Sequence, residues 1–483
     1  MASKAKVTAQ EKVKSGDRAE DESSDGVVKF PGGTPLATDE RRAQGKALRE
    51  ATPREAHSGW QAPKDRRDPI ELLIESNVDR LPELIPIRFG RMLQSPFAFY
   101  RGSAIIMAAD LATTAQSKLR VQACGDAHLM NFGGFATPER NVVFDINDLD
   151  ETLPAPWEWD VKRLSASVVI AGRFLRLSET DSARAARAAV RSYRERMTNY
   201  SSMRALEVWY AKIGVEDVLA AQSDAVRGLI RQRLETARER SSPEFVFPKL
   251  VEQRGAAPRI KDDPPLIFHP TAKVAPGVRT GFRDQVALYR QSLPEHVRVL
   301  FDRYRLCDVA VKVVGVGSVG TTCGIGLWVA GDADPLFLQI KEARASVLEA
   351  YAGKSLHKNH GQRVVTGQRL MQSASDIFLG WSETVKGRHF YIRQLRDTKL
   401  AAIIEDWDGG LLRDYARLCG WALAKAHARS GDAAMIAGYM GASQAFDDAI
   451  SEFAVEYADQ NQKDYRAFVK AVRSGRVQAL IES

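Results

Sequence analysis

The chain has 483 residues, of which 44% are hydrophobic and 27% are charged, as in a globular protein that can build a sizeable core. Its formal net charge of +8 suits an anionic partner such as a nucleotide, but no nucleic-acid-binding module accompanies it, so no nucleic-acid partner is expected. The chain has no run of 18 apolar residues, no signal-peptide core and no C-x-x-C pair. These absences exclude a membrane-spanning helix, a disulfide framework and a zinc site, and we expect a cytoplasmic protein with no membrane partner.

The N-terminal segment, residues 1–65, is rich in charged residues, Ser, Gly and Pro and poor in large apolar residues. Such a segment buries too little surface to offset its chain entropy, so we expect a disordered tail. Ordered structure is expected from D-P-I-E-L-L onward, where Asp68 caps a helix and Pro69 takes its first position. Helices are predicted from there to about residue 115.

The next part of the chain predicts a strand, a turn and a β-hairpin. The strand is V-Q-A-C-G-D, and the hairpin pairs N-F-G-G-F-A-T with V-V-F-D-I-N across P-E-R-N. A helix follows Pro156, with one apolar face formed by Val161, Leu164, Val168, Ala171 and Leu175. Residues 180–240 are predicted to be helical, and residues 241–282 are broken by prolines and predicted to be a long connection.

The C-terminal half changes from strands to helices. Strands are predicted in V-A-V-K-V-V-G-V-G-S-V-G, C-G-I-G-L-W-V-A and P-L-F-L-Q-I-K, followed by a helical stretch and the strand pair D-I-F-L-G-W-S-E-T and R-H-F-Y-I-R-Q-L. From about residue 409 the pattern is helical. The whole therefore indicates an α+β protein.

Three polar residues in the hairpin region have the spacing that phosphoryl transfer requires. Asp126 and Asn131 have the D-x-x-x-x-N spacing of a kinase catalytic loop, in which the Asp accepts the substrate proton and the Asn ligates a metal. Asp145 ends the apolar strand V-V-F-D, and the hairpin folds it back toward Asn131. Asp145 is therefore predicted to be the second metal ligand, because carboxylate and amide oxygens bind Mg²⁺.

Other interpretations of this region were weighed. D-x-x-x-x-N alone is more often a pair of turn residues, and the hairpin and the strand-terminal Asp are what favour a site. An EF-hand loop in D-I-N-D-L-D fails, because Asp150 stands where the sharp turn needs Gly. Asp148 is predicted to supplement the metal site, Asp150 to lie in a solvated acidic turn, and His128 to support the catalytic turn.

A glycine motif near residue 315 predicts a phosphate-binding turn. Gly315, Gly317, Ser318 and Gly320 lie in G-V-G-S-V-G, and the following T-T-C-G-I-G-L-W-V-A is strand-like, whereas a Rossmann fingerprint continues into a helix. A strand, glycine turn and strand is how kinases cover the phosphates of ATP with backbone N–H groups. Lys341 ends F-L-Q-I-K about twenty residues later and is predicted to neutralise the α- and β-phosphates.

Kinases pair this lysine with a glutamate on a helix. Glu349 in A-S-V-L-E-A-Y is the candidate for that partner. Glu342 is adjacent to Lys341, and neighbouring residues of a strand point to opposite faces, so Glu342 is expected to point away.

These motifs resemble known families. G-D-A-H-L-M-N followed by V-V-F-D resembles the H-G-D-x-H-x-x-N … I-D motif of aminoglycoside phosphotransferases and choline kinases, which have the protein-kinase-like fold. The resemblance extends to P-W-E-W-D-V-K-R-L, and implies that Asp160 braces the catalytic loop. Residues 65–483 also look like the bacterial DUF2252 family, through C-G-D-A-H-L-M-N-F-G, F-D-I-N-D-L-D-E, V-V-G-V-G-S-V-G and G-Q-R-L-M-Q.

The chain departs from the kinase-like pattern in two ways. Cys124 stands where the phosphotransferases have His, and the catalytic loop precedes the glycine motif instead of following it. The helix G-L-L-R-D-Y-A-R-L-C-G-W-A-L-A-K-A-H-A near the C-terminus resembles the helix that normally leads into the catalytic loop. The resemblance thus implies a circularly permuted, bilobal kinase-like fold, which is physically tolerable because the termini of domains often lie close together.

In this interpretation residues 66–300 hold the catalytic loop within a large helical lobe, residues 301–402 form a small antiparallel β lobe, and residues 403–483 complete the large lobe. The implied activity is an ATP- and Mg²⁺-dependent phosphotransferase acting on a hydroxyl-bearing small molecule or protein. Two alternatives stay open, namely a nucleotidyl transferase that moves AMP and a non-catalytic nucleotide-binding protein.

Overall fold

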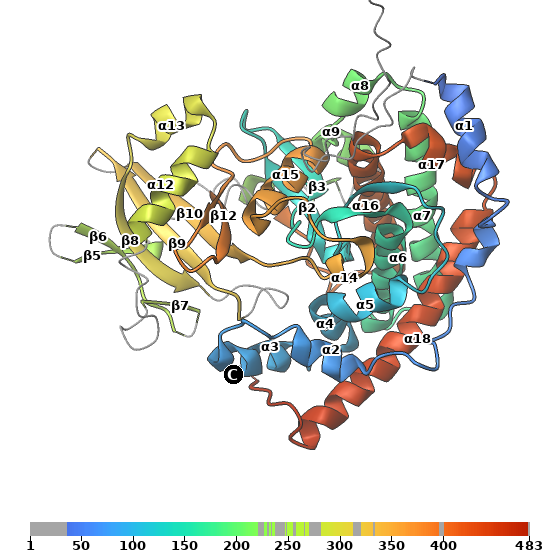
Figure 1. The fold of residues 1–483 in the computed structure, drawn as a ribbon, viewed down its shortest axis with the longest axis horizontal. Coiled ribbons are helices and arrows are strands. Elements are labelled where there is room, and N and C mark those ends of the chain that lie inside the picture. The colour runs from blue at the N-terminus through green and yellow to red at the C-terminus, as the bar shows by residue number, and fades with distance from the viewer. Residues whose placement is uncertain are drawn as a thin grey trace, which may run out of the picture.

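The computed structural model describes residues 36–481, with internal gaps at 221–226, 229–230, 233, 237–246, 248, 255–256, 265, 270–281, 313–319, 332–333 and 396–399. The predicted α+β class is confirmed: a six-stranded antiparallel sheet lies beside a larger, mainly helical part (Figure 1). Most of the expected N-terminal tail, residues 1–35, lies outside the described residues. Among the described helices, none combines the length and the apolar character that crossing a bilayer requires.

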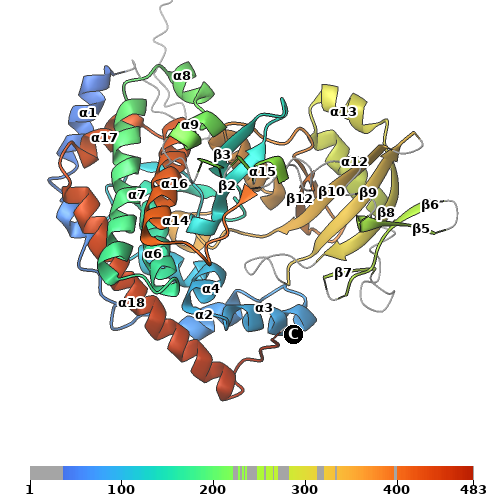
Figure 2. The same ribbon diagram turned by 180° about the vertical axis from the view of Figure 1, so that it is seen from behind.

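Four long helices form the core of the helical part. They are α6 (Trp157–Phe174), α7 (Glu179–Tyr200), α16 (Gly409–Ser430) and α18 (Ala445–Arg473), seen side by side from behind in Figure 2. α6 is the helix predicted after Pro156, and every residue from Trp157 to Gly172 is buried, because it has helices on several sides. Trp157 stacks on Tyr193 of α7 with ring centroids 5.7 Å apart.

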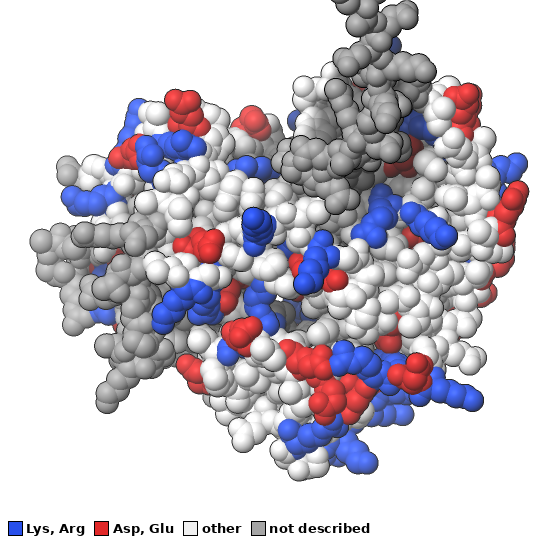
Figure 3. All heavy atoms as spheres, in the orientation of Figure 1, with Lys and Arg blue, Asp and Glu red and all other residues white. Residues whose placement is uncertain are grey.

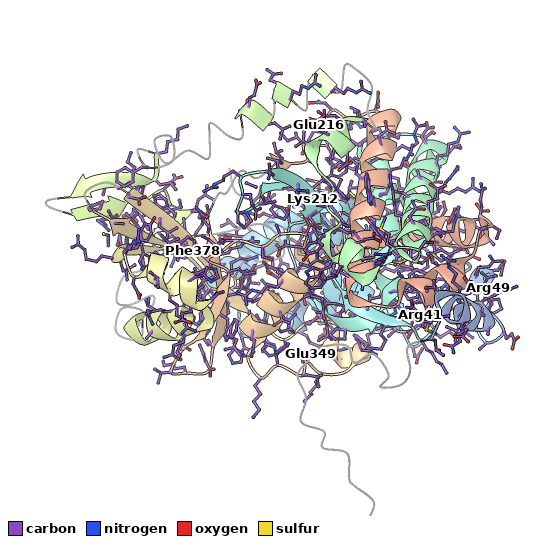
Figure 4. All side chains as sticks on the ribbon, turned by 90° about the horizontal axis from the view of Figure 1, so that it is seen from above. Arg41, Arg49, Lys212, Glu216, Glu349 and Phe378 are labelled. Atoms are coloured by element: carbon purple, nitrogen blue, oxygen red, sulfur yellow. The ribbon has the colours of Figure 1, made fainter. Side chains whose placement is uncertain are left out.

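The expected tail is ordered from residue 36, which corrects its predicted end at residue 65. Helix α1 (Thr38–Ala47) packs on α17 (Ala433–Met440), and a side chain at Gly45 would collide with the backbone of Met435. Arg41 pairs with Asp432 at 3.1 Å, and Arg49 donates to the carbonyl of Tyr439 at 2.7 Å. Arg41 and Arg49 mark this end of the molecule in Figure 4. The polar composition of this segment indicated disorder, but packing against α17 orders it.

The helices predicted after residue 68 are present. Asp68 caps α2 (Pro69–Glu75) by accepting a 2.8 Å hydrogen bond from the N–H of Ile70, with Pro69 at the first position as predicted. The short helices that follow are η2 (Pro82–Leu84), α3 (Ile85–Met92), α4 (Pro96–Gly102) and α5 (Ala104–Leu111). In Figure 1, α2, α3, α4 and α5 lie below α6, α7 and α16, and the segment then leads into the first strand.

The predicted hairpin is confirmed. β2 (Phe132–Ala136) and β3 (Val142–Ile146) pair antiparallel, with Gly133 opposite Asp145. The strand before it, β1 (Arg120–Ala123), pairs with β4 (Leu153–Pro156), so the loops after β1 and after β3 meet at one place. The two-residue strand β13 (Leu400–Ala401) extends the hairpin on the side of β2.

The six-stranded sheet has the order β11-β12-β10-β9-β8-β7. Its strands are β7 (Ile267–Phe268), β8 (Arg305–Lys312), β9 (Cys323–Ala330), β10 (Asp334–Ala343), β11 (Gly380–Glu383) and β12 (His389–Gln394). One face carries an apolar cluster with α12 (Phe282–Ser292) and α13 (Glu295–Phe301). The other face packs against the hairpin of β5 (Val251–Arg254) and β6 (Ala257–Ile260).

This packing corrects two expectations. The described residues of 241–282 are not a bare connection, because they supply the β5–β6 hairpin and the edge strand β7. The β part also begins before residue 301, since α12 and α13 belong to its core. The helical character predicted for 180–240 is confirmed in the described residues, which include α7, α8 (Ala205–Tyr210) and α9 (Val215–Ala220).

Two helices connect the sheet to the helical part. α14 (Glu349–Ala352) and α15 (His360–Met371) follow β10, and both lie near the centre of Figure 1. α15 packs on β11 and β12 on one side and on α16 on the other. It therefore fixes the sheet against the strands that carry the predicted catalytic residues.

Candidate functional site

The side chain of Asp160, on α6, binds the backbone of the loop after β1. Asp160 accepts hydrogen bonds from the N–H groups of Cys124 at 2.5 Å and Gly125 at 3.0 Å, which is the bracing contact that the resemblance implied. Gly125 has φ = +81° and lies so close to the carbonyl of Glu151 that a side chain would collide with it. His427 of α16 contacts Asp160 at 3.1 Å, so the loop rests on two helices far apart in the sequence.

Asp126 follows this turn with its side chain 18% exposed. Its Oδ1 accepts a 2.6 Å hydrogen bond from Nε of Arg163, which also forms an ion pair through Nη2. Its Oδ2 lies 3.8 Å from Nε2 of His128. Burial raises the pKa of Asp126 above its ordinary value, although the charge of Arg163 opposes that shift. One oxygen is thus anchored by Arg163, and the other faces the neutral ring of His128.

Asn131 and His128 complete this loop. Asn131 donates from Nδ2 to the carbonyl of Asp126 at 2.7 Å, which directs its side chain back over the loop and leaves its amide oxygen to accept. Its backbone carbonyl accepts from the N–H of Asn147 at 2.7 Å, so the loop after β3 lies directly alongside. Burial, with Arg101 and Arg163 nearby, lowers the pKa of His128 well below its ordinary value, and the ring is a neutral support.

Asp145 lies in β3 with a side chain that is 0% exposed. Its Oδ2 forms an ion pair with Nζ of Lys425 and accepts hydrogen bonds from the N–H and Oγ of Ser373 at 2.9 and 2.8 Å. Its Oδ1 accepts from the N–H of Ile146 at 2.9 Å. Both carboxylate oxygens are occupied by protein donors, so the geometry does not favour the metal-ligand role that the sequence assigned to Asp145.

The carboxylates that contact the six-stranded sheet are Asp148 and Asp150, three and five residues after Asp145. We call the segment that carries them the acidic loop. Nζ of Lys341, whose side chain is 4% exposed, is 2.8 Å from Oδ2 of Asp150 and 3.5 Å from Oδ2 of Asp148. Tyr391 of β12 donates to Oδ1 of Asp150 at 2.5 Å. This acidic loop therefore joins β10 to the strands of the catalytic loop.

The charges of this group shift one another's pKa values. Burial alone would lower the pKa of Lys341, but Asp148 and Asp150 outweigh burial and hold it well above its ordinary value. Burial likewise opposes ionisation of Asp150, but Lys341 and its hydrogen-bond donors lower its pKa. The pKa of Asp148 is raised by burial and by the charge of Asp150. The group thus contains an ionised Lys341–Asp150 pair with Asp148 beside it.

Lys341 pairs with Asp150 and Asp148, not with the glutamate that was expected. Glu349 lies 3.8 Å from Nδ1 of His360, and Figure 4 shows it at the margin of the molecule. Glu342 points away from Lys341 as predicted and pairs with Arg388 at 2.6 Å. The acidic partner comes from the loop after β3, and α15 supplies no glutamate at all.

The glycine turn is described only in part. Gly315, Gly317 and Ser318 lie outside the described residues, and Gly320 is described with φ = +88°. The carbonyl of Gly320 accepts a 2.7 Å hydrogen bond from the N–H of Leu81. The strands on either side of the turn, β8 and β9, pair antiparallel, and Lys341 of β10 lies opposite Cys323 at the start of β9. Lys341 is therefore on the third strand, close to the end of the turn.

The acidic loop, with Asp148 and Asp150, offers a carboxylate oxygen to a divalent cation. Oδ1 of Asp148 is buried and has no hydrogen-bond partner among the described residues, so it is an acceptor without a donor. The described part of the chain contains no cluster of three or more His, Cys, Asp or Glu side chains with metal-site geometry. This fits Mg²⁺ better than zinc, because Mg²⁺ commonly uses one or two carboxylates together with substrate phosphates.

Three residues that shape the site have no role assigned by the sequence motifs, although Arg163 was expected to have an ion-pair or backbone-carbonyl partner. Arg163 anchors Asp126, Lys425 neutralises Asp145, and Tyr391 binds Asp150. Arg163 follows Asp160 by three residues, one turn along the same helix face, so helical spacing could have indicated it. Lys425 and Tyr391 lie hundreds of residues from their partners, and no local pattern signals them.

Comparisons with known proteins identify the family without supplying an activity. No curated protein and no solved structure matches the chain. The model of one family, described as "Uncharacterized protein conserved in bacteria (DUF2252)", matches residues 80–471, which include every site residue described above. The chain therefore belongs to the DUF2252 family.

Proposed function

We propose that the protein is an ATP- and Mg²⁺-dependent phosphotransferase with a circularly permuted kinase-like arrangement. One observation carries the proposal: Lys341, on β10, the second strand after the glycine turn and the third counted from β8, pairs with the acidic loop that adjoins Asn131. In kinases, too, a lysine on the third strand and a metal-binding Asp converge on the phosphates from opposite sides.

The roles follow the observed contacts. Asp126 is the base, since Arg163 fixes Oδ1 and leaves Oδ2 to accept a proton. Asn131 and Asp148 are the metal ligands, with Asp148 replacing Asp145 because Oδ1 of Asp148 lacks a donor. Lys341 and the glycine turn hold the phosphates of ATP. Mg²⁺, when bound, neutralises charge on those phosphates.

The order of elements at α16 supports the permutation. The last turn of α16 lies against β1, where Oγ of Ser430 accepts a 3.2 Å hydrogen bond from the N–H of Gln122. A side chain at Gly431 would meet Val121. The helix α16 thus ends beside β1, the strand that leads into the catalytic loop. In an unpermuted kinase-like chain these two segments would follow one another directly in the sequence.

The reaction class is transfer to a hydroxyl group. Asp126 accepts the proton of the acceptor hydroxyl while the acceptor oxygen bonds to the γ-phosphorus. The bond from that phosphorus to the β,γ-bridging oxygen breaks, and ADP leaves. The acceptor is a small molecule or a protein side chain.

A labelled-nucleotide assay tests the proposal. The full chain is incubated with Mg²⁺, an extracted metabolite pool and ATP labelled at the γ- or the α-phosphate. Transfer of the γ-label to an acceptor is the expected result. Transfer of the α-label would instead identify an AMP transferase, and binding of ATP with no transfer of either label would identify a non-catalytic nucleotide-binding protein.

A further inference from the structure

A cavity lies beside β1 and β4, on the side that α15 covers. Its walls are these two strands, the segment 352–357 and the middle of α15 (Arg363, Thr366 and Gly367), and its volume is about 170 Å³. Cavities that hold drug-sized ligands measure roughly 300–1,000 Å³, so this one suits a few waters or a small solute and is too small for a nucleotide.

The lining of this cavity is basic. Arg120, Lys354, His357 and Arg363 lie in its wall, and no Asp or Glu of the described residues does. In Figure 3, separate groups of Lys and Arg side chains lie over the middle of the face, with Asp and Glu side chains among them. Arg120 uses Nη2 to donate to the carbonyl of Ala352 at 2.7 Å, so it closes the cavity at one end without a carboxylate partner.

Arg363 is the most deeply buried of these cations, with 2% of its surface exposed. Its Nη1 donates to the carbonyl of Thr152 at 2.5 Å, and its Nη2 donates to the carbonyls of Asp150 at 2.9 Å and Arg344 at 2.8 Å. Its Nε has no hydrogen-bond partner, and it forms no ion pair within the described part of the chain. Burial lowers the pKa of Arg363, and the charges of Glu151, Glu349 and Asp150 oppose that shift without cancelling it. An anion in the adjacent cavity would stabilise this buried cation further.

We propose that this cavity binds a small oxyanion of the size and charge of inorganic phosphate. Arg363 provides the buried end of the site, and Arg120 and Lys354 provide its rim. The geometry also connects the site to the acidic loop, because Arg363 donates to the backbone carbonyl of Asp150 while the side chain of Asp150 pairs with Lys341. The anion is therefore an effector that stabilises the acidic loop, and its binding does not depend on whether the chain transfers phosphate.

Calorimetric titration of the full chain with potassium phosphate tests this inference, with potassium chloride at equal ionic strength as the blank. The expected result is saturable binding at millimolar phosphate or below, at one site per chain. The double variant Arg120→Gln/Lys354→Gln should bind about tenfold more weakly, since each side chain contributes a charge-assisted contact. The matched control Arg303→Gln/Lys386→Gln removes two exposed cations elsewhere on the chain and should leave the affinity unchanged.

Each other outcome would overturn the inference. Heats no larger than those of chloride would show that the cavity holds no oxyanion, and equal affinity in the double variant would place the phosphate elsewhere. The rim variant changes no backbone contact of Arg363, so a loss of binding with an unchanged thermal midpoint does not reflect unfolding. A parallel titration with the ATP analogue AMP-PNP separates the two sites, because the rim variant should bind it as the wild type does.

Discussion

Nζ of Lys341 on β10 lies 2.8 Å from Oδ2 of Asp150, in the loop that follows β3. The two residues are 191 positions apart, and their ion pair joins the six-stranded sheet to the strands that carry Asp126 and Asn131. A buried pair of this kind is retained only if both charges are satisfied, and Tyr391 satisfies the second oxygen of Asp150. The proposed site therefore depends on a contact between distant segments.

Replacing Lys341 tests that contact. Lys341→Met should weaken binding of Mg·ATP by about tenfold or more, because one charge-assisted contact to phosphate is lost. It should also lower the thermal midpoint, since Asp150, whose side chain is only 29% exposed, loses its cation. Calorimetry and thermal denaturation measure the two effects. The control Lys386→Met removes an exposed lysine of the β11–β12 turn and should change neither.

Asp126 should be needed for turnover and not for nucleotide affinity. Asp126→Asn keeps the shape of the side chain and a hydrogen-bond acceptor for Arg163 but removes the base. Turnover of γ-labelled ATP is expected to fall by about 10²-fold or more, with ATP affinity within about threefold of the wild type. Asp65→Asn, at an exposed position, is the matched control. Normal turnover in the Asp126 variant would refute the proposed mechanism.

Asp148 and Asp145 should respond differently to the same change. Asp148→Asn removes charge from a carboxylate that has an oxygen without a donor, so Mg²⁺-dependent ATP binding should weaken while the fold is retained. A Mg²⁺ titration of ATP binding measures this effect. If Asp148→Asn left the Mg²⁺ dependence unchanged, the metal role would have to move to another residue.

Asp145→Asn should chiefly affect stability. It leaves Lys425 buried without its counter-ion, and breaking a buried ion pair from one side costs about 3–5 kcal/mol. The free energy of unfolding from denaturant titration should fall by this order. The double variant Asp145→Leu/Lys425→Met removes both charges and should recover much of the loss. Recovery would show that Asp145 serves the core, and its failure would point to a role beyond the ion pair.

The pH dependence of stability should reveal a third buried lysine, Lys162. Burial lowers the pKa of Lys162 on α6 from its ordinary value to about 7, although Glu158 opposes the shift. Between this pH and the unfolded pKa of about 10.4, the unfolded chain binds a proton that the folded chain does not. The free energy of unfolding should therefore rise with pH from about 7 to about 10, relative to the variant Lys162→Met. Parallel curves for wild type and variant would contradict this, and Lys46→Met is the control for an exposed lysine.

Local patterns in the sequence predicted local structure well. The hairpin of β2 and β3, the cap at Asp68 and helix α6 follow from turn residues, capping chemistry and apolar periodicity, all of which act within a few residues. The contact between Asp160 and the loop after β1 was also predicted, because Asp160 belongs to the segment that resembles the phosphotransferase motif. These features need no knowledge of the distant chain.

The partners of the acidic residues could not be predicted in this way. Asp145 looked like a ligand because it ends an apolar run, but Ser373 and Lys425, 228 and 280 residues away, occupy its oxygens. Asp150 looked solvated because its neighbours are polar, but Lys341 approaches from the sheet. Helix α1 looked disordered because its own surface is polar, and only packing on α17 orders it.

The hydrogen bond between Gln122 and Ser430 has a consequence for how the protein is made. Synthesis proceeds from the N-terminus, so the loop with Asp126 leaves the ribosome long before α16 exists to support it. His427 and Lys425 reach Asp160 and Asp145 only after the 267 and 280 residues that separate each pair have been synthesised. The candidate site is thus assembled as one of the last steps of folding, and a nascent or C-terminally truncated chain lacks it.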